Sequence, residues 1–167
     1  MSQRKVFTGK LFDVYVTRKE LPNGHTGYWE SIDHPGASAI VPFCGGRILL
    51  IRQYRAVVGE YIWEIPAGVL EPGETPYQCA KREIIEETGY SAKKLVPVGK
   101  IYPAAGCSNE VIHIFKAECG KRGNDNREAG EIIKLRHFTA KEVKALVRNG
   151  KIYDAKTLSA FALLGIA

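Results

Sequence analysis

Residues 68–90 read GVLEPGETPYQCAKREIIEETGY, and their second half places Glu83, Glu86 and Glu87 within about one and a half helical turns. Like charges three or four residues apart weaken a helix by roughly 0.2–0.5 kcal/mol per pair. Two carboxylates about 4 Å apart at a partly buried site repel by roughly 4 kcal/mol at an effective dielectric of 20. Either these charges spread into water as a solvated acidic face, or they hold a hard divalent cation through clustered oxygens.

The boundaries of this helix are well marked in the sequence. Thr75 is suited to the N-cap, Pro76 to the first helical position, and Gln78 completes a capping box. Gly89 is a natural C-terminal stop. The face expected to pack against a sheet carries Tyr77, Ala80, Ile84 and Thr88.

The loop before the helix favours the metal interpretation. It contributes two more carboxylates, Glu71 and Glu74, and Gly68 permits close backbone approach. The backbone carbonyl of Ala67 is a further candidate oxygen ligand. A loop that brings carboxylates and accessible backbone groups close to an acidic helix is suited to bind metal-bound phosphates.

The whole segment resembles the Nudix box of the Nudix hydrolases. That pattern is Gly, five residues, Glu, seven residues, Arg-Glu, an aliphatic, any residue, Glu-Glu, any residue, Gly and an aliphatic. Tyr90 departs from it, since an aromatic residue occupies the last aliphatic position. The matching positions are Gly68, Glu74, Arg82, Glu83, Ile84, Glu86, Glu87 and Gly89.

The resemblance implies an α+β fold of Nudix type, an α/β/α sandwich with a small N-terminal β-strand extension. It also implies a Mg²⁺-dependent hydrolase, with Mn²⁺ as the alternative ion, that cleaves a nucleoside diphosphate linked to another group. Arg82 would orient the carboxylates and Glu74 would support the loop. The implied metal ligands are Ala67 through its carbonyl, Glu83, Glu87 and, in an assisting catalytic role, Glu86.

The remaining pattern agrees with a mixed α+β order rather than a regular βαβ alternation. Residues 10–21 and 26–33 predict an N-terminal hairpin or meander, so we expect an N-terminal β subdomain at 1–34 and a Nudix domain at 35–167. A long polar loop is expected at 119–130. Further strands are expected at 37–43, 47–55, 61–65, 94–102, 110–118 and 131–138, and helices at 140–148 and 155–165.

The resemblance extends outside the box to one branch of the family. Residues 34–42, 51–55 and 63–68 resemble the ADP-ribose pyrophosphatases and their nucleotide-sugar relatives. That branch exchanges its N-terminal strand pair between subunits, which implies a homodimer. The substrate contacts implied are Arg55 on the diphosphate, Arg52, Glu110 near the metals, and Tyr28 or Trp29 on the base.

Two points stay open within this branch. The general base would be a glutamate of the loop at 127–131, with Glu128 chosen and Glu131 in reserve. Ala105 stands where ADP-ribose enzymes usually carry a proline, with Pro103 two residues earlier, so GDP-mannose or a broad range of nucleoside diphosphate sugars is the alternative substrate. A silent nucleotide sensor and an RNA-end hydrolase are the rivals; intact glutamates argue against the first.

Composition bounds the partners and the compartment. The 167 residues are 45% apolar and 25% charged, typical of one soluble globular domain. A net charge of +6 favours anionic partners, but its scatter disfavours an extended nucleic-acid surface. No apolar run is long enough for a membrane span, and no secretory signal is evident. The four cysteines form no C-x-x-C pair, so we expect reduced thiols in a cytoplasmic protein.

Overall fold

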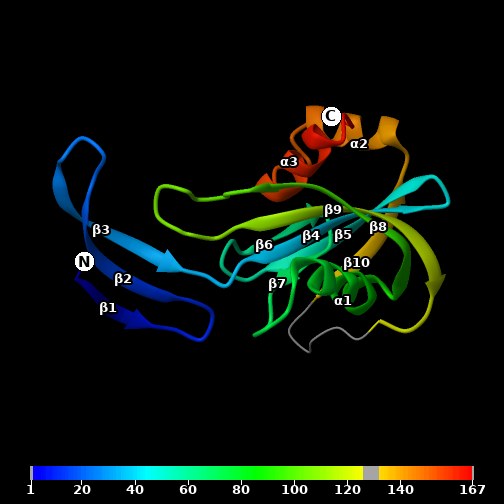
Figure 1. Ribbon diagram of the computed structural model, residues 1–167. Coiled ribbons are helices and arrows are strands. Elements are labelled where there is room, and N and C mark those ends of the chain that lie inside the picture. The colour runs from blue at the N-terminus through cyan, green and yellow to red at the C-terminus, as the bar shows by residue number, and fades with distance from the viewer. Residues whose placement is uncertain (1, 126–131, 167) are drawn as a thin grey trace.

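A computed structural model describes residues 2–125 and 132–166 (Figure 1). The larger sheet has the strand order β10-β5-β4-β9-β8, with β6 paired to β5 and β7 paired to β4. Its one parallel pairing among the described strands joins β4 to β9. The strands are β4 (Ala37–Cys44), β5 (Arg47–Arg55), β6 (Glu60–Glu64), β7 (Ala67–Val69), β8 (Tyr90–Ile101), β9 (Ile112–Arg122) and β10 (Ile133–Phe138).

Helices cover both faces of this sheet, α1 (Pro76–Thr88) on one and α2 (Ala140–Arg148) with α3 (Ala155–Leu163) on the other (Figure 1). The alternation of each strand sends successive side chains into the two layers. Ile40, Ile84 and Phe115 form the core beneath α1, whereas Leu50 and Phe161 belong to the core beneath α2 and α3. The α/β/α sandwich expected from the resemblance is therefore confirmed.

Helix α1 begins and ends as its sequence predicts. The Thr75 side chain accepts a hydrogen bond from the backbone N–H of Gln78, and the Gln78 side chain accepts one from the backbone N–H of Thr75. Gly89 ends the helix with φ 73°. Ala80, Ile84 and Thr88 are fully buried as expected. Tyr77 is not, with 51% of its surface exposed, because it lies in the first turn and only the edge of its ring reaches Phe115.

Several boundaries differ from the sequence prediction, among them the start of β8, which begins at Tyr90 rather than at residue 94, and two of the differences are informative. Residues 67–69 were expected in a loop but form the short strand β7, in which Gly68 pairs with Ser38 of β4. Strand β9 continues to Arg122, four residues into the expected polar loop, because Arg122 still has a partner in Tyr90 of β8. In both places, pairing with a neighbouring strand produces strand structure that the local sequence does not predict.

The N-terminal strands form a separate three-stranded antiparallel sheet that projects from the sandwich (Figure 1). It contains β1 (Gln3–Thr8), β2 (Asp13–Glu20) and β3 (Thr26–Asp33). The loop between β8 and β9 holds its end: Ile32 N–H donates to the Cys107 carbonyl at 2.8 Å, and Asn109 N–H donates to the Ile32 carbonyl at 3.2 Å. The meander is therefore tied to the main body at one end.

The expectation of four reduced thiols is wrong, since Cys44 and Cys119 form a disulfide. The parallel register of β4 and β9 places Phe43 opposite Glu118, so the next residue of each strand is a cysteine. Their Cα atoms lie 4.8 Å apart although 75 residues separate them in the chain. Cys79 and Cys107 are free. The thiols therefore no longer support a cytoplasmic location, which stays a prediction.

Within the described residues, the helices are too short or too polar to cross a membrane.

Candidate functional site

Arg82 lies at the centre of a group of carboxylates on α1 and the preceding loop. Its Nη1 donates to Glu83 Oε1 at 2.5 Å and to Glu86 Oε2 at 2.9 Å. Its Nε and Nη2 donate to the two oxygens of Glu74 at 3.0 and 2.9 Å. One guanidinium therefore connects the loop to the helix and partly offsets three carboxylates.

This arrangement changes the acid–base properties of Arg82 and Glu74. The hydrogen bond from Arg82 holds the pKa of Glu74 below its ordinary value of 4.5. The hydrogen bond to Glu74, with further bonds to Glu86 and Glu83, raises the pKa of Arg82. Both groups therefore stay charged at neutral pH, and the loop stays attached to the helix.

Glu83 and Glu87 are largely withdrawn from solvent, with 7% and 1% of their surface exposed. Glu87 Oε2 accepts from the backbone N–H of Ala67 at 3.0 Å. Gly68 lies directly against the Glu83 carboxylate, so a Cβ at position 68 would occupy the space of that carboxylate. The φ of Gly68 does not lie in the left-handed region, so the backbone conformation does not require a glycine. The close approach of the Glu83 carboxylate does require one.

The donor set suits a hard cation, because Mg²⁺ prefers carboxylate and carbonyl oxygens. Within residues 2–125 and 132–166, however, no three His, Cys, Asp or Glu side chains converge on one point as a finished metal cluster. Arg82 accounts for this, since it draws Glu83 and Glu86 toward itself. A cation would have to displace part of that ion pairing to reach Glu83 and Glu86.

A second charged group faces the helix across the site. The Glu64 carboxylate is 1% exposed and accepts from Arg55 Nε at 2.8 Å and Arg55 Nη2 at 2.7 Å. Lys156 Nζ also bonds to Glu64, and to Asp154 at 3.1 Å. Burial alone would raise the pKa of Glu64, but hydrogen bonds and charges from Arg55 and Lys156 outweigh burial and lower it.

Two adjoining cavities join these groups. A cavity of about 470 Å³ is lined by Arg82, Glu83 and Glu86, and another of about 280 Å³ is lined by Glu110 and Lys156. Both are lined by Arg55, Ala67, Gly68 and Val69. The acidic helix, Arg55 and Glu110 therefore line two adjoining cavities that share these four residues, as expected for a metal-dependent site with an arginine beside it.

The NUDIX domain model matches residues 33–161, which is most of the chain and includes both charged groups. The chain belongs to the Nudix family. The Nudix box therefore corresponds to the loop β7–α1 and helix α1 in this structure.

Relatives of this Nudix chain are named for several roles. It is 38% identical over 167 residues to the ADP-ribose pyrophosphatase of Bacillus subtilis, covering 98% of this chain and 90% of that protein. It is 34% identical over 163 residues to the methanol dehydrogenase activator of Bacillus methanolicus, covering 96% and 88%. A crystal structure titled ADP compounds hydrolase superposes with a TM-score of 0.84 at 24% identity, covering 98% and 90%, and shows the shared fold.

Not every predicted substrate residue lies near the Nudix box. Arg52 lies opposite Trp63 of β6 and stacks over Tyr61 and Trp63, with centroid distances of 5.2 and 6.0 Å. It is three strand positions from Arg55, so the two arginines point to opposite faces of the sheet. The structure therefore brings Arg55, but not Arg52, to the Nudix box.

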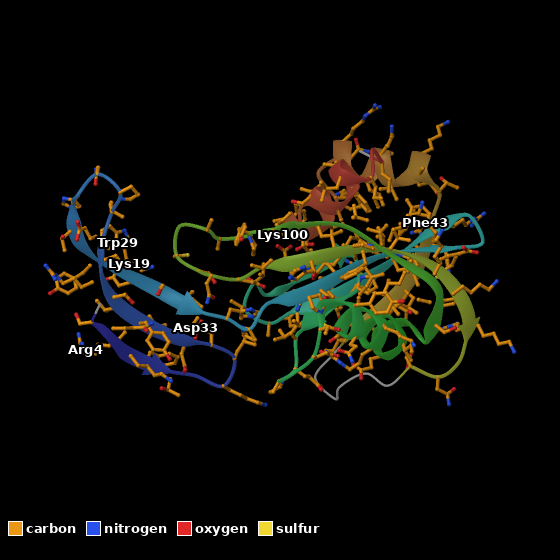
Figure 2. All side chains as sticks on the ribbon, in the orientation of Figure 1. Arg4, Lys19, Trp29, Asp33, Phe43 and Lys100 are labelled. Carbon is orange, nitrogen blue, oxygen red and sulfur yellow. A yellow bond between two sulfur atoms is a disulfide. The ribbon has the colours of Figure 1, made fainter. Side chains whose placement is uncertain are left out.

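Tyr28 and Trp29 lie on β3 of the projecting sheet. Figure 2 labels Trp29 there. Neither is core: Tyr28 is 72% exposed, and Trp29 is half-buried against a cavity of about 580 Å³. Ala105, in place of the usual proline, lines the same cavity. Glu128 and Glu131, the two candidates for the general base, lie outside the described residues.

The sequence analysis missed Glu64, Lys156 and Leu11 as residues of the Nudix site. Leu11, between β1 and β2, lines the cavity of Glu83 and Glu86. Glu64 stands within the 63–68 segment that resembles the ADP-ribose branch, and this was the available signal. Lys156 follows the Asp154 cap of α3 and had no signal, because its partner Glu64 is 92 residues away.

Proposed function

We propose that this Nudix chain hydrolyses the diphosphate of ADP-ribose or a related nucleoside diphosphate sugar and releases a nucleoside monophosphate and a sugar phosphate. One observation carries the proposal: the Arg82–glutamate group and Arg55 line the same space, with Gly68 pressed against Glu83. Family membership and the ADP-ribose pyrophosphatase relative support a hydrolase acting on diphosphate bonds. GDP-mannose is the closest alternative substrate, as Ala105 suggests.

In this proposal the acidic residues bind the metal ion and the basic residues bind the phosphate or position the carboxylates. Glu83, Glu86, Glu87 and the Ala67 carbonyl would hold Mg²⁺, which when bound offsets the negative charge of a diphosphate. Arg55 is held by Glu64 through Nε and Nη2, so its Nη1 is the donor left for a non-bridging oxygen. Arg82 orients Glu83 and Glu86. Glu128, or Glu131 in its place, is proposed to accept the proton of the attacking water.

The experiment is a substrate panel with Mg²⁺ on the native protein and on Glu87→Gln: ADP-ribose, GDP-mannose, UDP-glucose, diadenosine polyphosphate and triphosphorylated RNA. We expect one nucleotide sugar to be cleaved and kcat to fall by about 10²–10³-fold in Glu87→Gln, since one charge of the site is lost. Glu118→Gln is the matched control, because Glu118 is an exposed glutamate of β9.

Each outcome of the panel decides between candidates. Cleavage of ADP-ribose alone would make Ala105 a neutral variation, and cleavage of GDP-mannose would make it a specificity change. Nucleotide binding without turnover would favour the nucleotide-sensor hypothesis over the enzyme hypothesis. One relative of this chain is named as an activator of another protein. RNA cleavage with steep salt dependence would favour the RNA-end alternative.

The assembly and location complete the proposal. We propose a homodimer whose residues 1–34 form the contact between subunits and place Trp29 or Tyr28 on the substrate base. Exposed apolar side chains on or beside β1 support an interface: Val6, Phe7, Leu11 and Phe12 are 44%, 53%, 60% and 36% exposed. Sedimentation of the full chain tests the dimer. A cytoplasmic location also remains part of the proposal.

A further inference from the structure

A further cavity, of about 540 Å³, is lined by the Arg55–Glu64 pair but by no residue of the Nudix box. It is an open hollow bordered by the hairpin of β5 and β6 and the start of α3. No role proposed above uses it. Its walls include Gln53, Arg55, Val57, Val58, Glu64 and Lys156.

Gln53 is the unusual residue of this cavity. Only 7% of its surface is exposed, yet its Oε1 accepts no hydrogen bond from any described residue. A buried polar atom without a partner costs roughly 1–3 kcal/mol, and native proteins contain few of them. The nearby cations do not satisfy it, because Arg55 and Lys156 direct their hydrogen bonds to Glu64 and Asp154. The acceptor is therefore open to a donor from a bound molecule or a water.

The two sides of the cavity narrow the chemistry of that molecule. On the polar side the charges of Arg55 and Lys156 are matched by those of Glu64 and Asp154. This wall therefore has no net charge that would attract a second anion. The other side is apolar, formed by Ala56, Val57, Val58 and Ile62. A neutral ring with hydroxyl groups on one edge and C–H groups on the other fits both sides.

We infer that this cavity takes the sugar of the nucleoside diphosphate sugar, with one sugar hydroxyl donating to Gln53 Oε1. The inference rests on the proposed function. Arg55 makes the connection, since it lines this cavity and both cavities of the Nudix box. A substrate whose diphosphate contacts Arg55 has its sugar within reach of Gln53, two residues away on the same face of β5. Gln53 is then a specificity-determining residue.

The test measures product inhibition of the Mg²⁺-loaded enzyme with ADP-ribose as substrate. In Gln53→Met, which keeps the shape and removes the amide, we expect the inhibition constant of ribose 5-phosphate to rise about tenfold, the size of one hydrogen bond. The constant for AMP, the product without this sugar, should not change. The thermal midpoint should stay equal or rise, because an unpartnered buried acceptor has been removed.

Three outcomes would overturn the inference. An unchanged constant for ribose 5-phosphate would leave the cavity as a water site. An equal rise for AMP would indicate a general disturbance of the enzyme. A fall in the thermal midpoint would make Gln53 structural.

A second variant protects the test against a folding defect. Val58→Trp should fill part of the cavity from a side chain that is 58% exposed, and it should weaken ribose 5-phosphate but not AMP. Equal weakening, or none, would count against the site. If no nucleotide sugar is cleaved, the proposed function fails, and calorimetric titration with ribose 5-phosphate still tests the cavity.

Discussion

The two walls of the site differ in their balance of charge. On the α1 wall one cation, Arg82, faces Glu74, Glu83 and Glu86, and Glu87 lies beside them on the same helix. On the opposite wall two cations, Arg55 and Lys156, are matched by two carboxylates, the buried Glu64 and Asp154. The first wall therefore has spare negative charge, whereas the charges of the second wall balance.

This difference matches the two halves of the proposed ligand. A surplus of carboxylates is stabilised when a divalent cation binds. On the balanced wall, Arg55 bonds to Glu64 through Nε and Nη2, and its Nη1 is the donor that faces a phosphate oxygen in the proposal. Neither wall alone describes a nucleotide-sugar site. Together they favour a metal ion on α1 and a phosphate oxygen on Arg55.

The largest expected effect comes from disturbing the acidic wall without changing its charge. Gly68→Ala places a methyl group where the Glu83 carboxylate lies, so Glu83 must move. We expect kcat/KM to fall by about 10²–10³-fold, comparable to losing a preorganised electrostatic group. Gly123→Ala is the control, because a Cβ there meets nothing within 4 Å. Native activity in Gly68→Ala would show that the position of Glu83 does not matter.

A change on the balanced wall should act mainly on stability. Glu64→Gln leaves Arg55 and Lys156 facing each other, and we expect a loss of about 2–4 kcal/mol in unfolding free energy at pH 7, discounted because Arg55 is partly exposed. Urea unfolding at several pH values measures it, with Glu118→Gln as control.

The pH dependence follows from the lowered pKa of Glu64. Its folded-state pKa lies below the ordinary value of 4.5, so its contribution is complete above about pH 4.5 and is lost as the pH falls through the folded pKa. The gap between the native protein and Glu64→Gln should therefore shrink below that pH. A gap that stays constant down to pH 3 would contradict the ion pairing.

Binding of Mg²⁺ to the α1 wall should raise the unfolding free energy only when the glutamates of that wall are intact. Mg²⁺ at 100 times its dissociation constant should raise the unfolding free energy by about 2.7 kcal/mol. Calorimetric scans should show this gain in the native protein and, on its lower baseline, in Glu64→Gln. They should not show it in Glu87→Gln. An equal gain in all three would place the ion elsewhere.

The smallest effect compares two helix caps of the same design. Thr75→Ala and Thr139→Ala each remove a capping box, at about 1 kcal/mol apiece. Only Thr75 begins the helix that carries the glutamates, so only its loss should also raise the Mg²⁺ concentration needed for half-maximal activity. Equal activity profiles of the two variants would show that the start of α1 tolerates fraying.

The sequence by itself determined the local features. Both capping boxes, the Gly89 stop and the grouping of Glu83, Glu86 and Glu87 depend on residues within a few positions of one another, and the Nudix spacing is a property of one segment. The strand runs of β4, β5 and β10 likewise follow from alternation and turn residues near them. Such signals remain readable because their physical cause is local.

Tertiary structure alone decided the long-range pairings. Cys44 meets Cys119 because β4 and β9 run parallel, and Glu64 meets Lys156 across 92 residues because α3 begins beside β6. Gln53 is buried, with its Oε1 unpartnered among the described residues, because β10 pairs beside it and the β5–β6 hairpin and the start of α3 lie around it. These facts depend on which elements pack together, and that choice is made by the whole core rather than by any neighbouring residues.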